Sequence, residues 1–334
     1  MPLRILLLAA ALPTLSAQPK KIVVLGMGGA SALQTVSNKV SIVAPANYQA
    51  ALREIADADA LIGMVTPELI QAGRKLQWVQ MLSAGVETAL HLSGSTELRD
   101  RNIILTNNRI VQGPEIADHA FAMLLYLSRD LPRYVADKQT ETWQGGNYRG
   151  IELNGKQALI IGCGGIGMQI AVRSWAFGMR VTCVDPEDLP FSPFVGHTVK
   201  PDQLDEVLPK ADVVFVAAPH TPQSHKMLGP RQFELMKQNS YFIAVSRGAL
   251  YDLASLNKAL DSKRLAGAGV DVTDPEPLPP GNPLWKFPNA IVTPHIAGRS
   301  DRDQERILAT VRENIRRFAE GLPLVNVVDK QKGY

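Results

Sequence analysis

The sequence predicts an α/β protein made of two units, each with a doubly wound parallel sheet. Short apolar runs alternate along the chain with amphipathic stretches of helical period. That alternation is typical of a parallel sheet covered by helices on both faces. The length of 334 residues is enough for about two domains with a sizeable core in each. A hydrophobic content of 46% and a charged content of 20% are those of an ordinary globular protein.

The first unit is expected to open with a buried strand at residues 22–26, directly after two lysines. A helical stretch at 48–57 is one of those that separate the strands. A long helix with a broad apolar face is expected over residues 115–131, and a polar stretch follows at 137–149. Further short apolar runs predict strands at 40–43, 60–63, 78–81 and 103–106.

The second unit is expected to contain six strands that alternate with helices, which is the count of a doubly wound sheet. A proline-rich loop is expected at residues 274–283, since proline cannot donate to a strand ladder. An amphipathic helix at 301–319 ends before Gly321 and Pro323, which are stop signals. The six strands are predicted at 158–161, 180–184, 213–217, 241–245, 267–272 and 290–292.

A glycine-rich turn connects the strand at 158–161 to a helix expected over 168–177. It reads Gly162-Cys163-Gly164-Gly165-Ile166-Gly167. Gly162 would make the tight bend, Gly164 would let the backbone approach a pyrophosphate, and Gly167 would let the helix pack close to the sheet. The helix N-terminus favours an anion. Because strand, turn and helix follow in the required order, we expect a Rossmann dinucleotide site formed by Gly162, Gly164, Gly165, Ile166 and Gly167. A glycine turn without a nucleotide is the alternative.

Asp185 follows the next strand, about 20 residues past the glycines, where a carboxylate would bind ribose hydroxyls. Glu187 and Asp188 are close by, and no arginine is there to receive the extra phosphate of NADP. Three acids would repel that phosphate, so the sequence favours NAD over NADP as the cofactor.

Three chemically useful side chains follow later strands of the second unit: Arg247, Glu276 and His295. Ligands of open α/β sheets bind outside the carboxyl ends of the strands, so the three are expected to face one crevice. Histidine is suited to proton transfer near neutral pH, and a carboxylate beside it favours the imidazolium. Arginine offers a fork of donors to a carboxylate or a developing oxyanion. We therefore predict a site that reduces a carbonyl next to a carboxylate.

The chain resembles the D-isomer-specific 2-hydroxyacid dehydrogenases over residues 20 to 330. The resemblance rests on the glycine turn and on motifs at 152–156, 176–181, 211–214, 246–248, 267–272, 276–279 and 293–298. It implies interconversion of a small 2-oxo acid and its D-2-hydroxy acid, with His295 as acid/base, Glu276 as its partner and Arg247 on the substrate carboxylate or carbonyl. It also implies that the loop Ser83-Ala84-Gly85-Val86 holds the substrate carboxylate, and that Asp271 faces the nicotinamide carboxamide. The other residues expected to border the cofactor are Pro219, Thr221, Val245, Ser246 and Gly298.

The same resemblance implies a Rossmann NAD-binding domain (126–299) inserted in a flavodoxin-like substrate domain (20–125 plus 300–334). It also implies a homodimer, to which the helix at 115–131 would contribute. Val245, Ala217 and the pair Asp118-His119 depart from the usual pattern, so the identity of the substrate stays open. Glu276 disfavours the formate-oxidising branch, which has glutamine there.

Residues 1–19 have the layout of a secretory signal peptide, with a short cationic start, an apolar stretch at 5–12 and a small residue before Gln18. The apolar stretch is too short to cross a bilayer as a stable helix. We also expect no membrane span in the mature chain, because no segment after residue 20 is both long and apolar enough. Export would conflict with NAD chemistry, since NAD is scarce outside the cell membrane. The localisation therefore stays open between an exported and a cytoplasmic protein.

Composition limits the remaining possibilities. With 35 basic and 32 acidic residues the net charge is +3, which argues against a nucleic-acid partner. The two cysteines, Cys163 and Cys183, are expected to be small buried residues, with neither a disulfide framework nor metal-ligand spacing. An NAD(H)-sensing binding protein on a dehydrogenase fold is the alternative to an enzyme. An exported protein that has lost turnover is a third.

Overall fold

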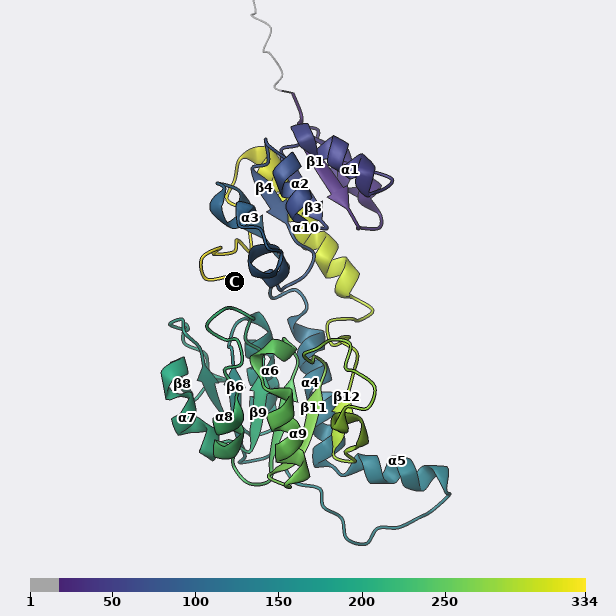
Figure 1. The fold of residues 1–334 in the computed structure, drawn as a ribbon, viewed down its shortest axis with the longest axis vertical. Coiled ribbons are helices and arrows are strands. Elements are labelled where there is room, and N and C mark those ends of the chain that lie inside the picture. Colours follow the sequence, from purple (N-terminus) through teal and green to yellow (C-terminus); the bar gives the residue numbers. More distant parts are fainter. Residues whose placement is uncertain (1–17) are drawn as a thin grey trace, which may run out of the picture.

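The computed structural model describes residues 18–334 and consists of two α/β domains, each built on one sheet (Figure 1). The five-stranded sheet has the order β2-β1-β3-β4-β5, and the seven-stranded sheet has the order β12-β11-β10-β9-β6-β7-β8. The named strands pair in parallel throughout both sheets. The predicted fold class of two parallel-sheet α/β domains is therefore confirmed. The signal-like segment lies almost wholly outside the described residues.

The first sheet has an apolar core on each face, because successive side chains of a strand point to opposite sides. Val23 and Leu61 pack on one face, and Ile22 and Ile62 pack on the other. The strands are β1 (Lys20–Leu25), β2 (Val40–Val43), β3 (Ala60–Gly63), β4 (Trp78–Gln80) and β5 (Ile104–Thr106). One face carries α1 (Tyr48–Glu54), η2 (Ile55–Asp57), α2 (Pro67–Ala72), η3 (Thr88–Leu92) and α3 (Glu97–Asp100), and the other carries η1 (Ala30–Val36) and α10 (Asp303–Glu320).

The second sheet is enclosed in the same way. Its strands are β6 (Gln157–Ile161), β7 (Arg180–Val184), β8 (His197–Val199), β9 (Val213–Val216), β10 (Ser240–Ala244), β11 (Leu265–Val270) and β12 (Ala290–Val292). One face packs on α4 (Gly113–Ser128) and α6 (Gly165–Ala176), and the other on α7 (Leu204–Val207), α8 (Pro230–Leu235) and α9 (Leu253–Asp261). A further helix, α5 (Leu131–Gln139), projects from the domain (Figure 1).

The strand orders place the ligand crevice of the second domain. Its chain starts at β6, runs outward through β7 and β8, and then crosses back to β9 on the other side of β6. This is the Rossmann order with one further strand, and the first sheet has the flavodoxin-like order. In such sheets a ligand binds where the order reverses, outside the carboxyl ends of the strands. Here that point lies between β6 and β9, where the glycine-rich turn begins.

One strand of the second sheet was not expected from the sequence. The edge strand β8 covers only His197-Thr198-Val199, and two of its three residues are exposed. Three residues with a mixed polar and apolar pattern carry too weak a periodicity to predict a strand. The other six strands lie within a few residues of their predicted ranges.

The helix α10 returns to the first domain after the chain has completed the second (Figure 1). Ile307, Val311, Ile315 and Phe318 on α10 pack against Ile22 and its neighbours in the first sheet. The helix ends at Gly321, whose φ of 70° is the left-handed conformation typical of a helix C-cap. The predicted boundary at residue 125 falls inside α4, which packs on the second sheet. Within the described part of the chain, no helix combines the length and apolarity needed to cross a membrane.

Candidate active site

The glycine-rich turn has the geometry that its sequence predicts. Gly162 has a φ of 86°, and a Cβ there would collide with the backbone of Ala218. A Cβ at Gly167 would collide with the carbonyl of Gly162, so α6 packs tightly on the turn. Gly164 caps α6, and no atom lies within 4 Å of the position its Cβ would take. The N-terminus of α6 therefore faces an open space that suits a pyrophosphate.

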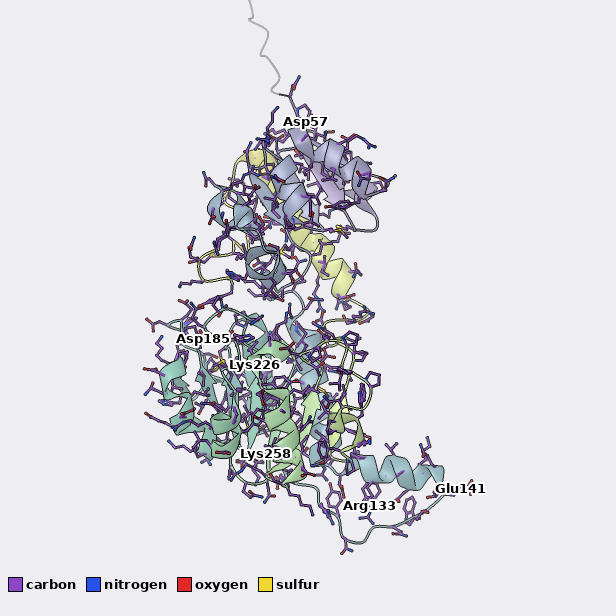
Figure 2. All side chains as sticks on the ribbon, viewed as in Figure 1. Asp57, Arg133, Glu141, Asp185, Lys226 and Lys258 are labelled. Atoms are coloured by element: carbon purple, nitrogen blue, oxygen red, sulfur yellow. A yellow bond between two sulfur atoms is a disulfide. The ribbon has the colours of Figure 1, made fainter. Side chains whose placement is uncertain are left out.

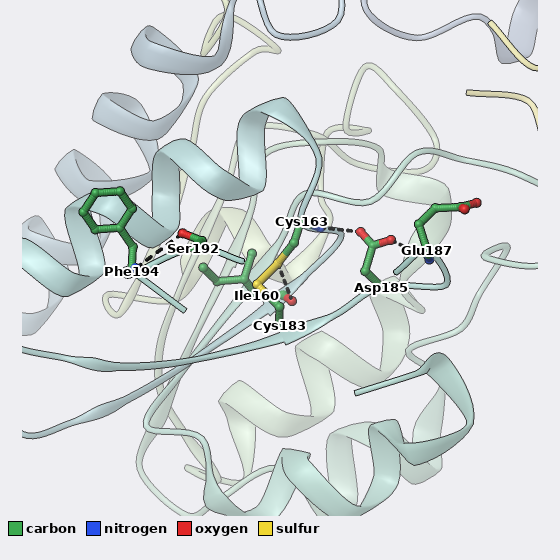
Figure 3. Close-up of a disulfide and its surroundings, with 7 residues drawn as sticks. All are labelled: Ile160, Cys163, Cys183, Asp185, Glu187, Ser192 and Phe194. Carbon is green, nitrogen blue, oxygen red and sulfur yellow. Dashed lines mark hydrogen bonds between the residues drawn. A yellow bond between two sulfur atoms is a disulfide. The ribbon is translucent and has the colours of Figure 1, made fainter. Parts of the chain in front are cut away.

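The two cysteines form a disulfide, so the expectation of two unbonded buried cysteines was wrong (Figure 3). Cys163 lies in the glycine-rich turn and Cys183 in β7, and their side chains are almost fully buried. In the parallel pairing of β6 with β7, Cys183 stands opposite Ile160. That register brings Cys183 beside the turn after β6, although 20 residues separate the two cysteines. The bond ties the turn to the neighbouring strand.

Asp185 lies next to this disulfide, at the carboxyl end of β7 (Figures 2 and 3). Its carboxylate accepts hydrogen bonds from the backbone N–H of Cys163 at 2.8 Å and of Glu187 at 2.9 Å. Among residues 18–334 it forms no ion pair, so its negative charge remains available beside the turn. This is the position predicted for a carboxylate that binds ribose.

The acids after Asp185 are not free, and the sequence reasoning missed their partners. Lys332 binds Glu187 at 2.6 Å, and Lys200 binds Asp188 at 2.7 Å. Lys332 lowers the pKa of Glu187, and Lys200 lowers that of Asp188. Two lysines thus offset two of the three acids that were expected to repel the phosphate of NADP. Lys332 lies 145 residues from Glu187, so no local pattern shows the pair.

His295 and Glu276 meet at the carboxyl ends of later strands, as predicted. His295 Nδ1 lies 3.1 Å from both carboxylate oxygens of Glu276. His295 has a φ of 54°, a left-handed backbone conformation that few non-glycine residues adopt. With Nδ1 turned to Glu276, Nε2 is the ring nitrogen left for a substrate.

Asp271 holds the loop that carries His295. Its buried carboxylate accepts hydrogen bonds from the N–H of Ile296 and of Ala297, each at 2.9 Å, and from the Thr293 hydroxyl at 2.6 Å. His119 on α4 reaches the same Thr293 hydroxyl at 2.9 Å. Asp271 therefore positions the histidine, and its expected contact with nicotinamide stays a prediction.

Arg247 connects the two domains, because it pairs with Glu87 of the first domain. Its Nε lies 2.6 Å from a Glu87 oxygen, and the Glu87 side chain is only 12% exposed. A Cβ on Gly85 would collide with Nη2 of Arg247, so only glycine lets the guanidinium approach the loop this closely. Glu87 is the next residue but one after Gly85, and the sequence reasoning overlooked it.

The loop at 83–86, expected to hold the substrate, is fixed by one hydrogen bond of its own and one from a neighbouring segment. The Ser83 hydroxyl donates to the carbonyl of Gly85 at 2.7 Å, and the Asn107 amide donates to the carbonyl of Ala84 at 2.6 Å. Val86 is buried in the core beneath. The loop with Gly85 thus lies beside Arg247, as the prediction of a shared substrate site requires.

The remaining predicted cofactor residues lie on three loops of the second domain. Ser224 ties Pro219 and Thr221 together, because its hydroxyl donates to the carbonyl of Pro219 at 2.7 Å and accepts from the N–H of Thr221 at 2.9 Å. Val245 is buried, and the carbonyl of Gly298 accepts a hydrogen bond from Gln112 at 2.8 Å.

His220, between Pro219 and Thr221, was not singled out from the sequence. The pKa of His220 is lowered mainly by its burial, and the neighbouring His225 and the charge of Arg247 lower it further.

Four observations show that the residues present fit a dinucleotide. The open space at Gly164, the first N–H groups of α6 and the Asp185 carboxylate offer places for pyrophosphate and ribose. The Ser246 hydroxyl is buried and finds no hydrogen-bond partner among the described residues, as expected of a group that awaits a ligand. No group of three or more candidate metal ligands occurs in the described part of the chain.

Comparison with known proteins agrees with this geometry. Residues 121–297 match the family model described as "D-isomer specific 2-hydroxyacid dehydrogenase, NAD binding domain". A glyoxylate reductase of Korarchaeum cryptofilum is 32% identical over 86% of this chain and 88% of its own. A D-3-phosphoglycerate dehydrogenase of Archaeoglobus fulgidus is 31% identical over 83% of this chain, which spans about half (53%) of that relative.

Solved structures give the same result for the fold. A D-isomer-specific 2-hydroxyacid dehydrogenase family protein of Aeromonas salmonicida has a TM-score of 0.77 at 28% identity, covering 94% of this chain and 100% of its own. An NADPH-dependent glyoxylate/hydroxypyruvate reductase of Sinorhizobium meliloti, in complex with NADP and sulfate, has a TM-score of 0.80 at 25% identity. It covers 94% of this chain and 100% of its own. The family and the NAD-binding domain expected from the sequence are thereby confirmed.

Proposed function

This chain belongs to the D-isomer-specific 2-hydroxyacid dehydrogenase family, and we propose that it reduces a small 2-oxo acid to the D-2-hydroxy acid with NADH. The observation that carries the proposal is the pairing of His295 with Glu276, together with an arginine after β10, Arg247, that reaches across to the first domain. A proton donor and a carboxylate-binding group thus flank one site beside the glycine-rich turn.

When bound, NADH supplies the hydride that reaches the carbonyl carbon of the substrate. His295 donates a proton from Nε2 to the carbonyl oxygen, and Glu276 fixes the orientation of the ring through Nδ1. Arg247 and the N–H groups of the loop at 83–86 bind the substrate carboxylate. In the oxidative direction His295 accepts the hydroxyl proton instead.

Asp185 supports NAD over NADP. Its carboxylate is bound by backbone N–H groups only and keeps its charge where a ribose 2′-oxygen would lie. This single acid, rather than the three acids together, carries the preference, because Glu187 and Asp188 are paired with lysines.

We infer that the chain acts as a homodimer through the arm formed by α5 and residues 140–150 (Figures 1 and 2). No residue of α5 is buried, and Leu131, Val135 and Trp143 expose large apolar side chains. An isolated helix of nine residues is marginal in water, and exposed apolar patches mark contact surfaces. The partner that covers this arm is a second copy of the chain, because the family resemblance implies a homodimer.

The direct test is consumption of NADH by the purified protein with glyoxylate, hydroxypyruvate, pyruvate and bulkier 2-oxo acids. Turnover with one of them is expected, and the ranking reports the size of the pocket. Tight NADH binding without any turnover would favour the NAD(H)-sensing alternative.

The His295→Ala variant tests the role of the proton donor. We expect kcat to fall by about a hundredfold or more, the usual contribution of general acid–base catalysis. The Kd for NADH should stay near the wild-type value, because His295 does not hold the cofactor. Turnover near wild type in this variant would remove His295 from the mechanism.

A further inference from the structure

The last six residues of the chain, 329–334, form a loop that we call the C-terminal loop. It leaves the first domain after Val328, which is buried and donates its N–H to the carbonyl of Leu105 at 2.8 Å. Lys330 anchors it there, because its ammonium donates to the carbonyls of Leu98 at 3.1 Å and Arg101 at 2.6 Å. The loop is therefore a fixed part of the substrate domain.

Its internal hydrogen bonds define one conformation. The Asp329 carboxylate accepts from the N–H of Gln331 at 2.9 Å and of Lys332 at 3.1 Å. The N–H of Gly333 donates to the carbonyl of Asp329 at 2.8 Å, and the N–H of Asp329 donates to the carbonyl of Tyr334 at 3.0 Å. Gly333 has a φ of 84°, which favours glycine. The turn closes on itself and presents Lys332 and Tyr334 outward.

Both side chains meet the second domain at the same carboxylate. The Tyr334 hydroxyl donates to Glu187 at 2.8 Å, and the Lys332 ammonium lies 2.6 Å from the same oxygen. Burial and the Glu187 charge raise the pKa of Tyr334, and the charge of Asp185 contributes. Glu187 is itself bound through its N–H to Asp185, the residue expected to hold ribose.

Gly333 is buried between the two domains. A Cβ at this position would lie 2.8 Å from His91 of the first domain and 3.6 Å from Thr221, in the loop expected to border the cofactor. The loop thus lies between the turn after β7 and the turn after β9, at the carboxyl ends of the two strands that flank β6. Figure 1 marks the C-terminus between the two domains, consistent with these contacts.

We propose that the C-terminal loop is part of the dinucleotide site, and that Lys332 and Tyr334 bind the adenosine half of the cofactor from the substrate domain. The inference rests on the proposed use of NADH. Tyr334 supplies an aromatic face and a hydroxyl beside the ribose, and Lys332 neutralises Glu187 there. Cofactor binding then involves both domains at the adenosine end, in addition to the contact of Arg247 with Glu87 near the substrate loop.

The test is the binding of ADP-ribose, which has the adenosine half and lacks nicotinamide, measured by calorimetry. Deletion of residues 331–334 keeps the Lys330 anchor. We expect it to weaken the binding of ADP-ribose by at least tenfold, since one aromatic contact and one charge-assisted hydrogen bond are lost. Reduced nicotinamide mononucleotide, which lacks adenosine, should bind the deleted and full chains alike.

Matched substitutions separate the contact from general effects of charge and ring. Lys332→Gln should weaken the binding of ADP-ribose several-fold. Lys258→Gln, which removes the same charge from an exposed site of the second domain, should leave that binding unchanged (Figure 2). Tyr334→Ala is compared in the same way with Tyr48→Ala on α1, whose hydroxyl bonds to Thr66 of the first domain. Unchanged or tighter ADP-ribose binding in the deleted chain would overturn the inference, while NADH-dependent turnover of the full chain would leave the proposed function standing. A full chain that bound neither NADH nor ADP-ribose would overturn both.

Discussion

Breaking the Cys163–Cys183 disulfide is expected to destabilise the nucleotide-binding domain without changing its fold. The bond closes a loop of 20 residues. In the chain-entropy account, a cross-link across a loop of that length restricts the unfolded chain by about 3 kcal/mol. For a domain of this size, each kcal/mol shifts Tm by roughly 2 to 4 °C, so the expected loss is about 6 to 12 °C.

The measurement compares oxidised and reduced wild type by calorimetry. Both sulfurs are buried, so reduction is done in denaturant and the protein is refolded with reductant present. This comparison keeps every packing atom and removes only the bond. The control is the double variant Cys163→Ala and Cys183→Ala, whose Tm must not respond to reductant.

Two results would refute the reasoning. One is a Tm that is the same within a degree or two in the oxidised and reduced wild type. The other is titration of two free thiols in the denatured, unreduced protein. The second result would mean that the cysteines stand beside each other without bonding.

Three further predictions test the site and the assembly. Asp185→Ala should weaken the binding of NADH several-fold and reduce the preference for NADH over NADPH, because the ribose hydroxyls lose an acceptor and the 2′-phosphate is no longer repelled. An unchanged ratio of the two Kd values in paired titrations would contradict the ribose contact. Glu87→Ala should raise KM for the 2-oxo acid about tenfold with a smaller effect on kcat, because Arg247 loses a charge-assisted hydrogen bond of about 1.5 to 3 kcal/mol. Glu87→Gln should restore part of the lost affinity for the 2-oxo acid. Equal KM values for the wild type and Glu87→Ala in steady-state assays would rule out this positioning role. Trp143→Ser should lower the molar mass measured by light scattering toward that of the monomer. Phe191→Ser, which removes a similarly exposed ring from the same domain, should leave the molar mass unchanged. A dimer that persists in Trp143→Ser would mean that the interface lies on another surface.

The parts of the site that could be predicted from sequence are those that short segments determine. The glycine-rich turn is one strand, one turn and one helix, and each glycine has a local steric reason. Arg247, Glu276 and His295 each follow a strand, and parallel strands bring their carboxyl ends to one edge. Their convergence therefore depends only on the strand assignments, which the apolar runs indicate.

The parts that could not be predicted depend on how distant segments meet. The disulfide requires the register that sets Cys183 opposite Ile160, and register is a property of the pair of strands rather than of either one. Glu87 and Arg247 meet only because the two domains face each other, and the same holds for Lys332 and Glu187. The number of acidic residues after β7 therefore overstated the repulsion of the NADP phosphate, because the lysines that neutralise two of these acids come from elsewhere in the chain.

The disulfide also bears on where this protein works. Disulfides form and persist in oxidising compartments and are rare in the cytosol of most organisms. A bond at the glycine-rich turn therefore favours an exported over a cytoplasmic protein, the two alternatives that the sequence left open, although an NAD-dependent reaction then needs a supply of NAD outside the cell membrane. Trapping the thiols with an alkylating reagent at the moment of cell lysis resolves this conflict. Two protected cysteines would place the folded protein in an oxidising compartment, where NAD must be provided to it. Two alkylated cysteines would place it with the cellular NAD pool and make the disulfide a product of later oxidation.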